Sequence, residues 1–271
     1  MKFDMSKAWN DATDMLGANR EVILALSGVF FFLPGFASSL LMHTVEPPVG
    51  ADQAALRGYL LELYKDNAPV IVVSAVVQLV GAITLLALLR DDSKPTVGEA
   101  LRTGLVGLLP YIGVYLLLVI GAFVAVLVLV GIPSALGLTV LAIVLMVLAV
   151  PLLVYVGIKL SLVTPVIAIE KLMNPIAIIR RSWALTKGNS LRLLLFYFLL
   201  GLVYVVASVV VGAVVGLGLT LLGDGTVFQV GNGILTGLVG AAGTMVFTVV
   251  IAAVHRQLAG PSAGNISQTF G

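Results

Sequence analysis

Six long apolar stretches, separated by short islands of charge, constrain this chain more than any other feature of its sequence. About 20 apolar residues are needed to cross the roughly 30 Å hydrocarbon core of a bilayer, and each stretch reaches that length. Five of them contain no charged residue, and the fourth contains only Lys159. We therefore predict six membrane spans, over residues 22–42, 68–89, 105–131, 135–164, 193–222 and 227–254.

The composition indicates lipid rather than water as the solvent of this chain. Hydrophobic residues make up 60% and charged residues 10%, whereas a soluble domain carries about 25% charged residues. The apolar residues do not alternate strictly, which favours helices over the strands of a membrane barrel. We predict an all-α, polytopic transmembrane bundle, a single integral membrane domain over residues 1–271, with a turn at residues 131–134. Four prolines can kink or break the third and fourth spans: Pro110, Pro133, Pro151 and Pro165.

Lys and Arg near the span ends indicate the orientation of the chain, because cytoplasmic loops carry the excess of positive charge. The other side holds only Arg57 and Lys65. The predicted cytoplasmic side, which includes both termini, holds twelve: Lys2, Lys7, Arg20, Arg90, Lys94, Arg102, Lys171, Arg180, Arg181, Lys187, Arg192 and Arg256. The first ~20 residues lack a cleavable apolar core, so we expect the first span itself to direct insertion.

Several segments between the spans have the pattern of short helices that lie in the membrane interface. Three are predicted on the cytoplasmic side, at residues 6–19, 95–102 and 174–187, and one on the other side at residues 52–65. Pro95 suits the first helical position of its segment. Because two spans follow each cytoplasmic segment, the chain is either three helix-plus-hairpin units or a bundle without a repeat.

The segment 174–187 is the most complete of these helices. Asn174 can cap it, Pro175 suits its first position, and Gly188 can end it. Its apolar face is predicted at Ile176, Ile179 and Trp183. A basic amphipathic helix of this kind is typical of segments that lie on a membrane surface. Four of its residues are candidate contacts for anionic lipid head groups: Arg180, Arg181, Trp183 and Lys187.

Residues 159–189 contain a pattern that is specific enough to suggest a family. They read KLSLVTPVIAIEKLMNPIAIIRRSWALTKGN. This stretch resembles the bacterial glycerophosphodiester phosphodiesterase membrane-domain family, and the six-span layout is compatible with it. The matching positions are Lys159, Ser161, Pro165, Glu170, Pro175, Arg181, Ser182, Trp183, Leu185, Thr186, Lys187 and Gly188.

The resemblance implies a bacterial inner-membrane protein, but it does not imply catalysis. Members of that family fuse the membrane part to a separate catalytic domain, and we expect that domain to be missing here. The residues agree with this expectation, since the sequence has no H-E-x-x-H, P-loop or G-x-S-x-G motif. It has no Cys, and its two histidines, His43 and His255, are predicted at opposite membrane boundaries. We expect no enzyme activity, no cofactor, no metal and no nucleic-acid partner.

Lys159 and Glu170 are the candidate polar site within or near the membrane, because charges at that depth are costly and mark function or a paired contact. In the functional alternative they bind an anionic head group or relay an ion together with Arg180 and Arg181. In the structural alternative Lys159 reaches the cytoplasmic surface, and Glu170 binds backbone N–H groups or pairs with an arginine of the basic helix.

Glycine pairs spaced four residues apart occur in the last two spans, at Gly212 and Gly216 and at Gly233 and Gly237. Small residues let helix backbones approach closely in lipid. They predict packing of the fifth span on the sixth, or alternatively a homodimer.

Three functions are compatible with the sequence. The first is a non-enzymatic protein that binds lipid, organises the membrane or scaffolds partners through its basic helices. The second is a transporter or flippase-like carrier of an amphiphilic substrate, with Lys159 and Glu170 at its site. The third is a membrane anchor for a separately encoded enzyme. We favour the first.

Overall fold

The computed structural model describes residues 2–42, 50, 52–90, 95–221, 223 and 225–260 of the 271-residue chain. Within these residues every regular element is a helix and none is a strand. Six helical stretches are long and apolar enough to cross a membrane: Arg20–Leu41, Gln53–Leu88, Val97–Ala135, Thr139–Ala168, Ser190–Thr220 and Thr226–Ala259. This confirms the predicted all-α, multi-pass membrane protein. His43 and Lys94 lie outside the described residues.

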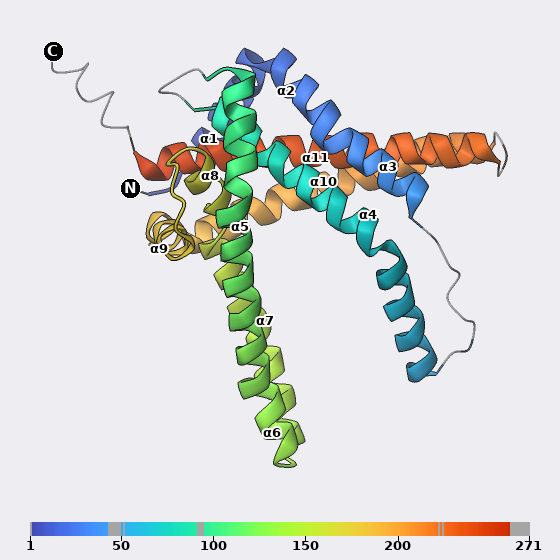
Figure 1. Cartoon of the computed structure of the whole chain (residues 1–271), viewed down its shortest axis with the longest axis vertical. Coiled ribbons are helices and arrows are strands. Elements are labelled where there is room, and N and C mark those ends of the chain that lie inside the picture. The colour runs from blue at the N-terminus through green and yellow to red at the C-terminus, as the bar shows by residue number, and fades with distance from the viewer. Residues whose placement is uncertain are drawn as a thin grey trace. The chain divides into compact units, whose positions relative to one another are not determined.

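Figure 1 shows the helices, which are named in chain order. They are α1 (Met5–Ala18), α2 (Arg20–Ser27), α3 (Leu33–Leu41), α4 (Gln53–Leu88), α5 (Val97–Val126), α6 (Ile132–Ala135), α7 (Thr139–Lys159), α8 (Val163–Ala168), α9 (Pro175–Leu185), α10 (Ser190–Thr220) and α11 (Thr226–Ala259). Two π-helical turns, Gly28–Phe32 and Leu127–Gly131, join α2 to α3 and α5 to α6. The first and third spans therefore each consist of two α-helices joined by a π-helical turn. The fourth span consists of α7 and α8, which are joined by a turn at residues 160–162.

The chain forms two compact units, which are described separately. Unit 1 comprises Met1–Ala18, Ile83–Leu200 and Thr248–Gly271. Unit 2 comprises Asn19–Ala82 and Gly201–Phe247. Each unit is built from segments that are not adjacent in the sequence. The long helices α4, α10 and α11 each contribute residues to both units.

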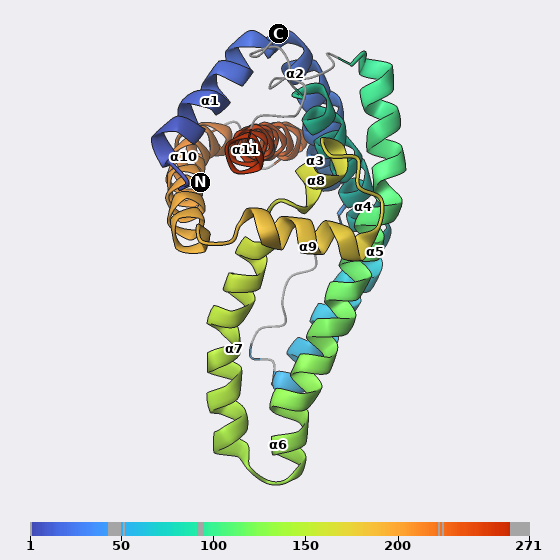
Figure 2. The ribbon, with the colours of Figure 1, turned by 90° about the vertical axis from the view of Figure 1, so that its left-hand side faces the viewer.

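In unit 1, α5 and α7 form a long hairpin with α6 at its tip (Figure 2). The turn follows α6, where Gly137 has a φ of +74°. Leu138 N donates to Pro133 O at 2.9 Å and Gly137 N donates to Ser134 O at 3.1 Å, which is the Schellman motif of a helix end. The predicted turn at residues 131–134 is therefore wrong. Pro133 lies in the first turn of α6, where its missing N–H is not needed, and the left-handed residue that ends the helix comes later.

The short helix α8 lies in the core of unit 1, although it is the last part of the fourth span. Its Val166 and Ile167 are fully buried. Gly107 lets α5 come close to it, because a Cβ added at Gly107 would lie 2.9 Å from Ile167 Cγ2 and 3.1 Å from Ile83 Cγ2. This close packing holds the chain that follows α8 against the body of unit 1.

Two of the predicted interfacial helices are instead the first turns of spanning helices. Residues 95–102 mostly belong to α5, which is capped by Thr96. The Thr96 side chain accepts from Glu99 N, and the Glu99 carboxylate accepts from Thr96 N at 2.9 Å. This capping box places Pro95 before the helix rather than at its first position. Residues 52–65 likewise form the start of α4, whereas α1 and α9 are separate helices as predicted.

In unit 2, small residues bring the backbones of α3 and α11 into contact. A Cβ added at Gly35 would lie 3.4 Å from Gly237 Cα, and one added at Gly237 would lie 3.1 Å from Phe36 N. A Cβ at Gly233 would lie 2.6 Å from Ser39 Oγ. The Gly233 and Gly237 pair therefore packs the sixth span on the first, and the predicted use of this pair against the fifth span is wrong.

Other glycines join the fifth and sixth spans within unit 2. Gly243 lies directly against the Tyr204 ring, and a Cβ at Gly231 would lie 2.6 Å from Leu219 Cδ2. An added Cβ would meet nothing within 4 Å at two glycines of α10, Gly212 and Gly216. Homodimerisation through that face of α10 stays a prediction.

The variant Gly237→Leu tests the contact between α3 and α11. We expect it to lower the free energy of unfolding by about 1–3 kcal/mol, because the new side chain would overlap the backbone of α3. Gly212→Leu is the matched control, with the same change at a glycine whose added Cβ would meet no described residue within 4 Å, and should leave stability unchanged. Apparent melting temperatures of the purified proteins in detergent measure both. Equal melting temperatures for the two variants would contradict the contact.

Candidate polar site at the end of the fourth span

The basic helix α9 is positioned by its cap and by its buried face. Asn174 Oδ1 accepts from Ile176 N and Ala177 N at 3.0 and 3.1 Å, which confirms the predicted cap. Ser182 Oγ donates to Lys159 O at 2.7 Å and ties α9 to the end of α7. The face packed on the protein carries the buried residues Ile178, Ser182 and Leu185. The predicted apolar face, with Ile176 and Trp183, lies on the opposite side of α9 and does not form this packing.

The residues after α9 are held by the N-terminal segment of the chain. Phe3 N donates to Asn189 Oδ1 at 2.8 Å, and Arg192 Nη1 donates to Phe3 O at 3.3 Å. The Phe3 ring lies edge-on to the Phe196 ring, with centroids 5.4 Å apart. Gly188 has a φ of +79°, so the chain leaves α9 through a left-handed glycine as predicted. Both ends of α9 are therefore held in place.

Glu170 lies at the centre of a cluster drawn from three elements of unit 1. It stands in the loop between α8 and α9, and its Oε2 accepts from Arg181 Nε of α9 at 2.7 Å. Its Oε1 lies 2.9 Å from His255 Nε2 of α11. The His255 side chain is buried, whereas the Arg181 side chain is 41% exposed. The structural alternative for Glu170, pairing with an arginine of the basic helix, is thereby confirmed.

Opposing effects set the charge state of Glu170. Burial raises the pKa of the carboxyl group. The hydrogen bonds to His255 and Arg181, together with attraction to their charges, outweigh burial and hold the pKa below the ordinary value of 4.5. Glu170 is therefore ionised at neutral pH and holds Arg181 as a charged partner.

Lys159, the last residue of α7, is almost completely buried and is 2% exposed. Its ammonium group lies 5.4 Å from the centre of the Tyr155 ring and 5.6 Å from that of the Trp183 ring. These two rings pack edge to face at 5.9 Å. Cations are attracted to aromatic faces at this range. In the part of the chain that the structure describes, no carboxylate pairs with Lys159, and the aromatic contacts replace the predicted exposure at the cytoplasmic surface.

The structure thus gives Lys159 and Glu170 separate partners, rather than bringing them together in one site. His255 and Tyr155 complete the two clusters, and neither was predicted there. His255 stands 85 residues from Glu170 in the sequence, so no local pattern connects them. Tyr155, in contrast, stands one helical turn before Lys159, and that spacing could have indicated the contact.

The outward side of α9 carries a row of exposed residues at helical spacing, which we call the α9 stripe. It consists of Ile176, Arg180, Trp183 and, in the turn just after the helix, Lys187. Ile176 is 54% and Trp183 39% exposed. Three of the four predicted lipid contacts therefore lie on the stripe, whereas Arg181 is bonded to Glu170. Among the described residues, no group of three His, Asp or Glu side chains could hold a metal ion.

Comparison of the chain with protein-family models, with curated proteins and with solved structures finds no match. The chemistry of the site is therefore inferred from its own geometry. The resemblance of residues 159–189 to the glycerophosphodiester phosphodiesterase membrane-domain family stays a prediction.

The variant Glu170→Gln tests the ionic contact with α9. Because its pKa is lowered by folding, Glu170 contributes stability that is fully present above the ordinary value of 4.5 and is lost as the pH falls through the lower folded value. We expect glutamine to lower the free energy of unfolding by about 1–2 kcal/mol near pH 7, and the difference from wild type to shrink as the pH falls below 4.5. Apparent melting temperatures over this pH range measure the effect.

The matched control is Glu62→Gln, which neutralises an exposed carboxylate of α4. It should change the melting temperature little at any pH. A wild-type advantage over Glu170→Gln that is the same at every pH would contradict a stabilising role for the ionised carboxylate.

Proposed function

We propose that this multi-pass protein binds anionic lipid head groups at the cytoplasmic face of a bacterial inner membrane, and that it organises lipids or partner proteins there without catalysis. The α9 stripe is the observation that supports this function. In this proposal both termini are cytoplasmic, as the twelve Lys and Arg of the positive-inside count suggest. Membership of the glycerophosphodiester phosphodiesterase membrane-domain family is part of the proposal, on the pattern of residues 159–189.

The stripe has the chemistry that an anionic membrane surface attracts. In the described part of the chain, neither Arg180 nor Lys187 forms a salt bridge, so both charges are available to an outside partner. On the same side of the helix, Trp183 lies between Arg180 and Lys187, and Ile176 lies one turn before Arg180. Trp is enriched at the level of lipid head groups, where its ring is half apolar and half wet. Each basic residue near such a surface contributes about 1 kcal/mol of attraction.

The neighbouring Arg181 has a different role in this proposal. Its Nε is hydrogen-bonded to Glu170, so its charge is already compensated within the protein. Arg181 therefore fixes the orientation of α9, and Arg180 and Lys187 contact lipid. A variant that neutralises Arg180, Arg181 and Lys187 together would lose lipid contacts and also displace α9, so its effect on lipid binding could not be assigned to either cause.

Quenching of Trp183 by brominated lipids tests the proposal directly. The chain contains two tryptophans, so Trp9→Phe leaves Trp183 as the single tryptophan, which is excited selectively over tyrosine. In bilayers of mixed composition, brominated phosphatidylglycerol should quench Trp183 more strongly than brominated phosphatidylcholine at the same mole fraction. The double variant R180Q/K187Q should remove most of this preference, since about 1 kcal/mol per charge is about fivefold in relative binding.

Two controls make the quenching experiment specific. K2Q/K7Q removes two exposed charges of the N-terminal segment and should leave the preference intact. Trp183→Phe leaves Trp9 as the reporter and should show no effect of R180Q/K187Q. Equal quenching by the two brominated lipids in the Trp9→Phe protein would overturn the proposal.

A carrier of an amphiphilic substrate is the second candidate function, and Lys159 favours it. A buried cation that lies against two aromatic rings is costly to keep in a membrane protein and by default marks a functional site. If the protein is a carrier, Lys159→Met should abolish movement of a fluorescent phospholipid across proteoliposome membranes while the protein still elutes as wild type. Equal rates for wild type, Lys159→Met and empty liposomes would exclude this candidate. A membrane anchor for a separate enzyme rests on the family resemblance alone.

A further inference from the structure

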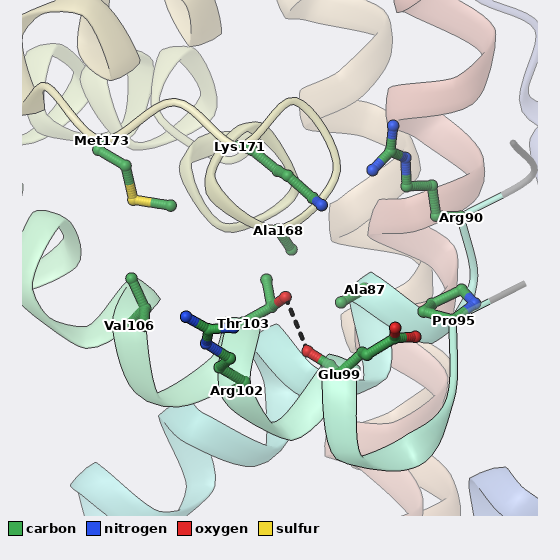
Figure 3. Close-up of a pocket in the computed structure, with 10 residues that line it drawn as sticks. All are labelled: Ala87, Arg90, Pro95, Glu99, Arg102, Thr103, Val106, Ala168, Lys171 and Met173. Atoms are coloured by element: carbon green, nitrogen blue, oxygen red, sulfur yellow. Dashed lines mark hydrogen bonds between the residues drawn. The ribbon is translucent and has the colours of Figure 1, made fainter. Parts of the chain in front are cut away.

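A cavity of about 510 Å³ lies in unit 1, where the end of α4, the first turns of α5 and the loop after α8 meet. This volume falls in the range of small-molecule sites, about 300–1,000 Å³. Its lining includes three basic residues: Arg90, which follows α4 by two residues, Arg102 of α5, and Lys171 of the loop after α8 (Figure 3). None of them belongs to the α9 stripe or to the Glu170 cluster.

The positive charge of this cavity is only partly compensated within the described chain, because its lining holds three basic residues and one acidic residue. None of the three basic side chains forms a salt bridge with a described carboxylate. Glu99 is the one acidic residue in the lining; its carboxylate accepts from Thr96 N in the capping box of α5, and its charge also attracts Lys171. Like charges that converge on one cavity repel each other, so an anion that enters it gains favourable contacts with all of them.

The backbone at Lys171 supports a specific role for its side chain. Lys171 has a φ of +55°, and no other non-glycine residue in the described part of the chain has a positive φ. A lysine in this conformation is strained, and such strain is found at ligand sites. In Figure 3 the Lys171 side chain extends toward that of Arg90, over Ala168 at the base of the cavity. The strained turn thus directs a second cation to the cavity that Arg90 also lines.

The remaining walls are apolar and indicate the rest of the ligand. Ala87 and Ala168 are buried beneath the charged groups. Val106 and Met173 line another part and are 48% and 43% exposed. Val106 also lies on α5 next to Leu105, which is 55% exposed on the spanning helix. A cavity with cations and an exposed apolar edge matches a molecule with an anionic head and a hydrocarbon part.

We propose that this cavity binds the phosphate group of an anionic amphiphile, such as a phospholipid, through Arg90, Arg102 and Lys171. Arginine donates paired hydrogen bonds to phosphate oxygens, and lysine adds a mobile charge. The apolar edge accommodates the adjoining acyl chains. The site shares no residue with the α9 stripe, so it can exist whether or not the stripe binds lipid.

Lipid titration followed by native mass spectrometry of the full-length protein tests the site, because it resolves each bound lipid. Phosphatidylglycerol should bind at one tight site, and R90Q/R102Q/K171Q should weaken this first binding step at least about tenfold. Diacylglycerol with the same chains lacks the phosphate and should bind no tighter to wild type than to this variant. Glycerol phosphate is then added as a competitor of phosphatidylglycerol. If it competes, the site also takes soluble phosphate esters, and if it does not, the site takes lipids only. Either result supports the phosphate site, provided that R90Q/R102Q/K171Q weakens the binding of phosphatidylglycerol.

Three further variants separate binding in this cavity from loss of folding and from lipid binding elsewhere on the protein. R90K/R102K/K171R keeps the three charges but loses the paired hydrogen bonds of arginine, so it should bind phosphatidylglycerol more tightly than R90Q/R102Q/K171Q and more weakly than wild type. K2Q/K7Q/R20Q removes the same number of charges elsewhere and should change the affinity less than about twofold. The proposal is overturned if R90Q/R102Q/K171Q binds phosphatidylglycerol like wild type, if diacylglycerol binds as tightly, or if only R180Q/K187Q weakens the tight site. The last result would place that lipid on the α9 stripe instead.

Discussion

The carboxylate of Glu170 joins three elements of unit 1 that are far apart in the sequence. It accepts from Arg181 of α9, lies 2.9 Å from His255 of α11, and follows directly after the buried helix α8. Burying a lone carboxylate would be costly, and these two partners compensate for it. This contact adds to the cap, the Ser182 bond and the buried face that position α9. Once Arg181 faces Glu170, the helical period turns Arg180 and Trp183 to the outside.

Seven basic residues of unit 1 fall into three groups with different physical roles. Arg181 is neutralised by a carboxylate, and Lys159 lies against two aromatic rings. The others, on the α9 stripe and in the cavity between α4 and α5, form no salt bridge with a described carboxylate. Charges of the third group are available for anions from outside, and lipid head groups are the most abundant anions at a membrane surface. This distinction underlies both proposed binding sites.

Lipid also explains how unit 2 is packed. Lipid tails are as apolar as the helices, so burial of apolar surface does not drive helices together, and close fit must do so. Glycines supply that fit: Gly35 and Gly237 bring α3 against α11, and Gly243 admits the Tyr204 ring. The same spacing at Gly212 and Gly216 meets no neighbour within the described chain. A glycine pair thus indicates that a close contact can form, but it does not identify the partner helix.

The sequence by itself determined the class of the protein, the number of spans, and the cap and end of α9. These depend on local properties, namely hydropathy over about 20 residues and the side chains within one helical turn of a helix end. It could not determine that Glu170 meets His255, that Gly237 faces α3, or that Arg90 and Lys171 line one cavity. The turn predicted at residues 131–134 is also misplaced, because Pro133 lies in the first turn of α6 and the chain reverses after that helix. Only the tertiary structure decided these features, because each depends on which distant segments pack together, and apolar helices in lipid carry almost no local signal for their partners.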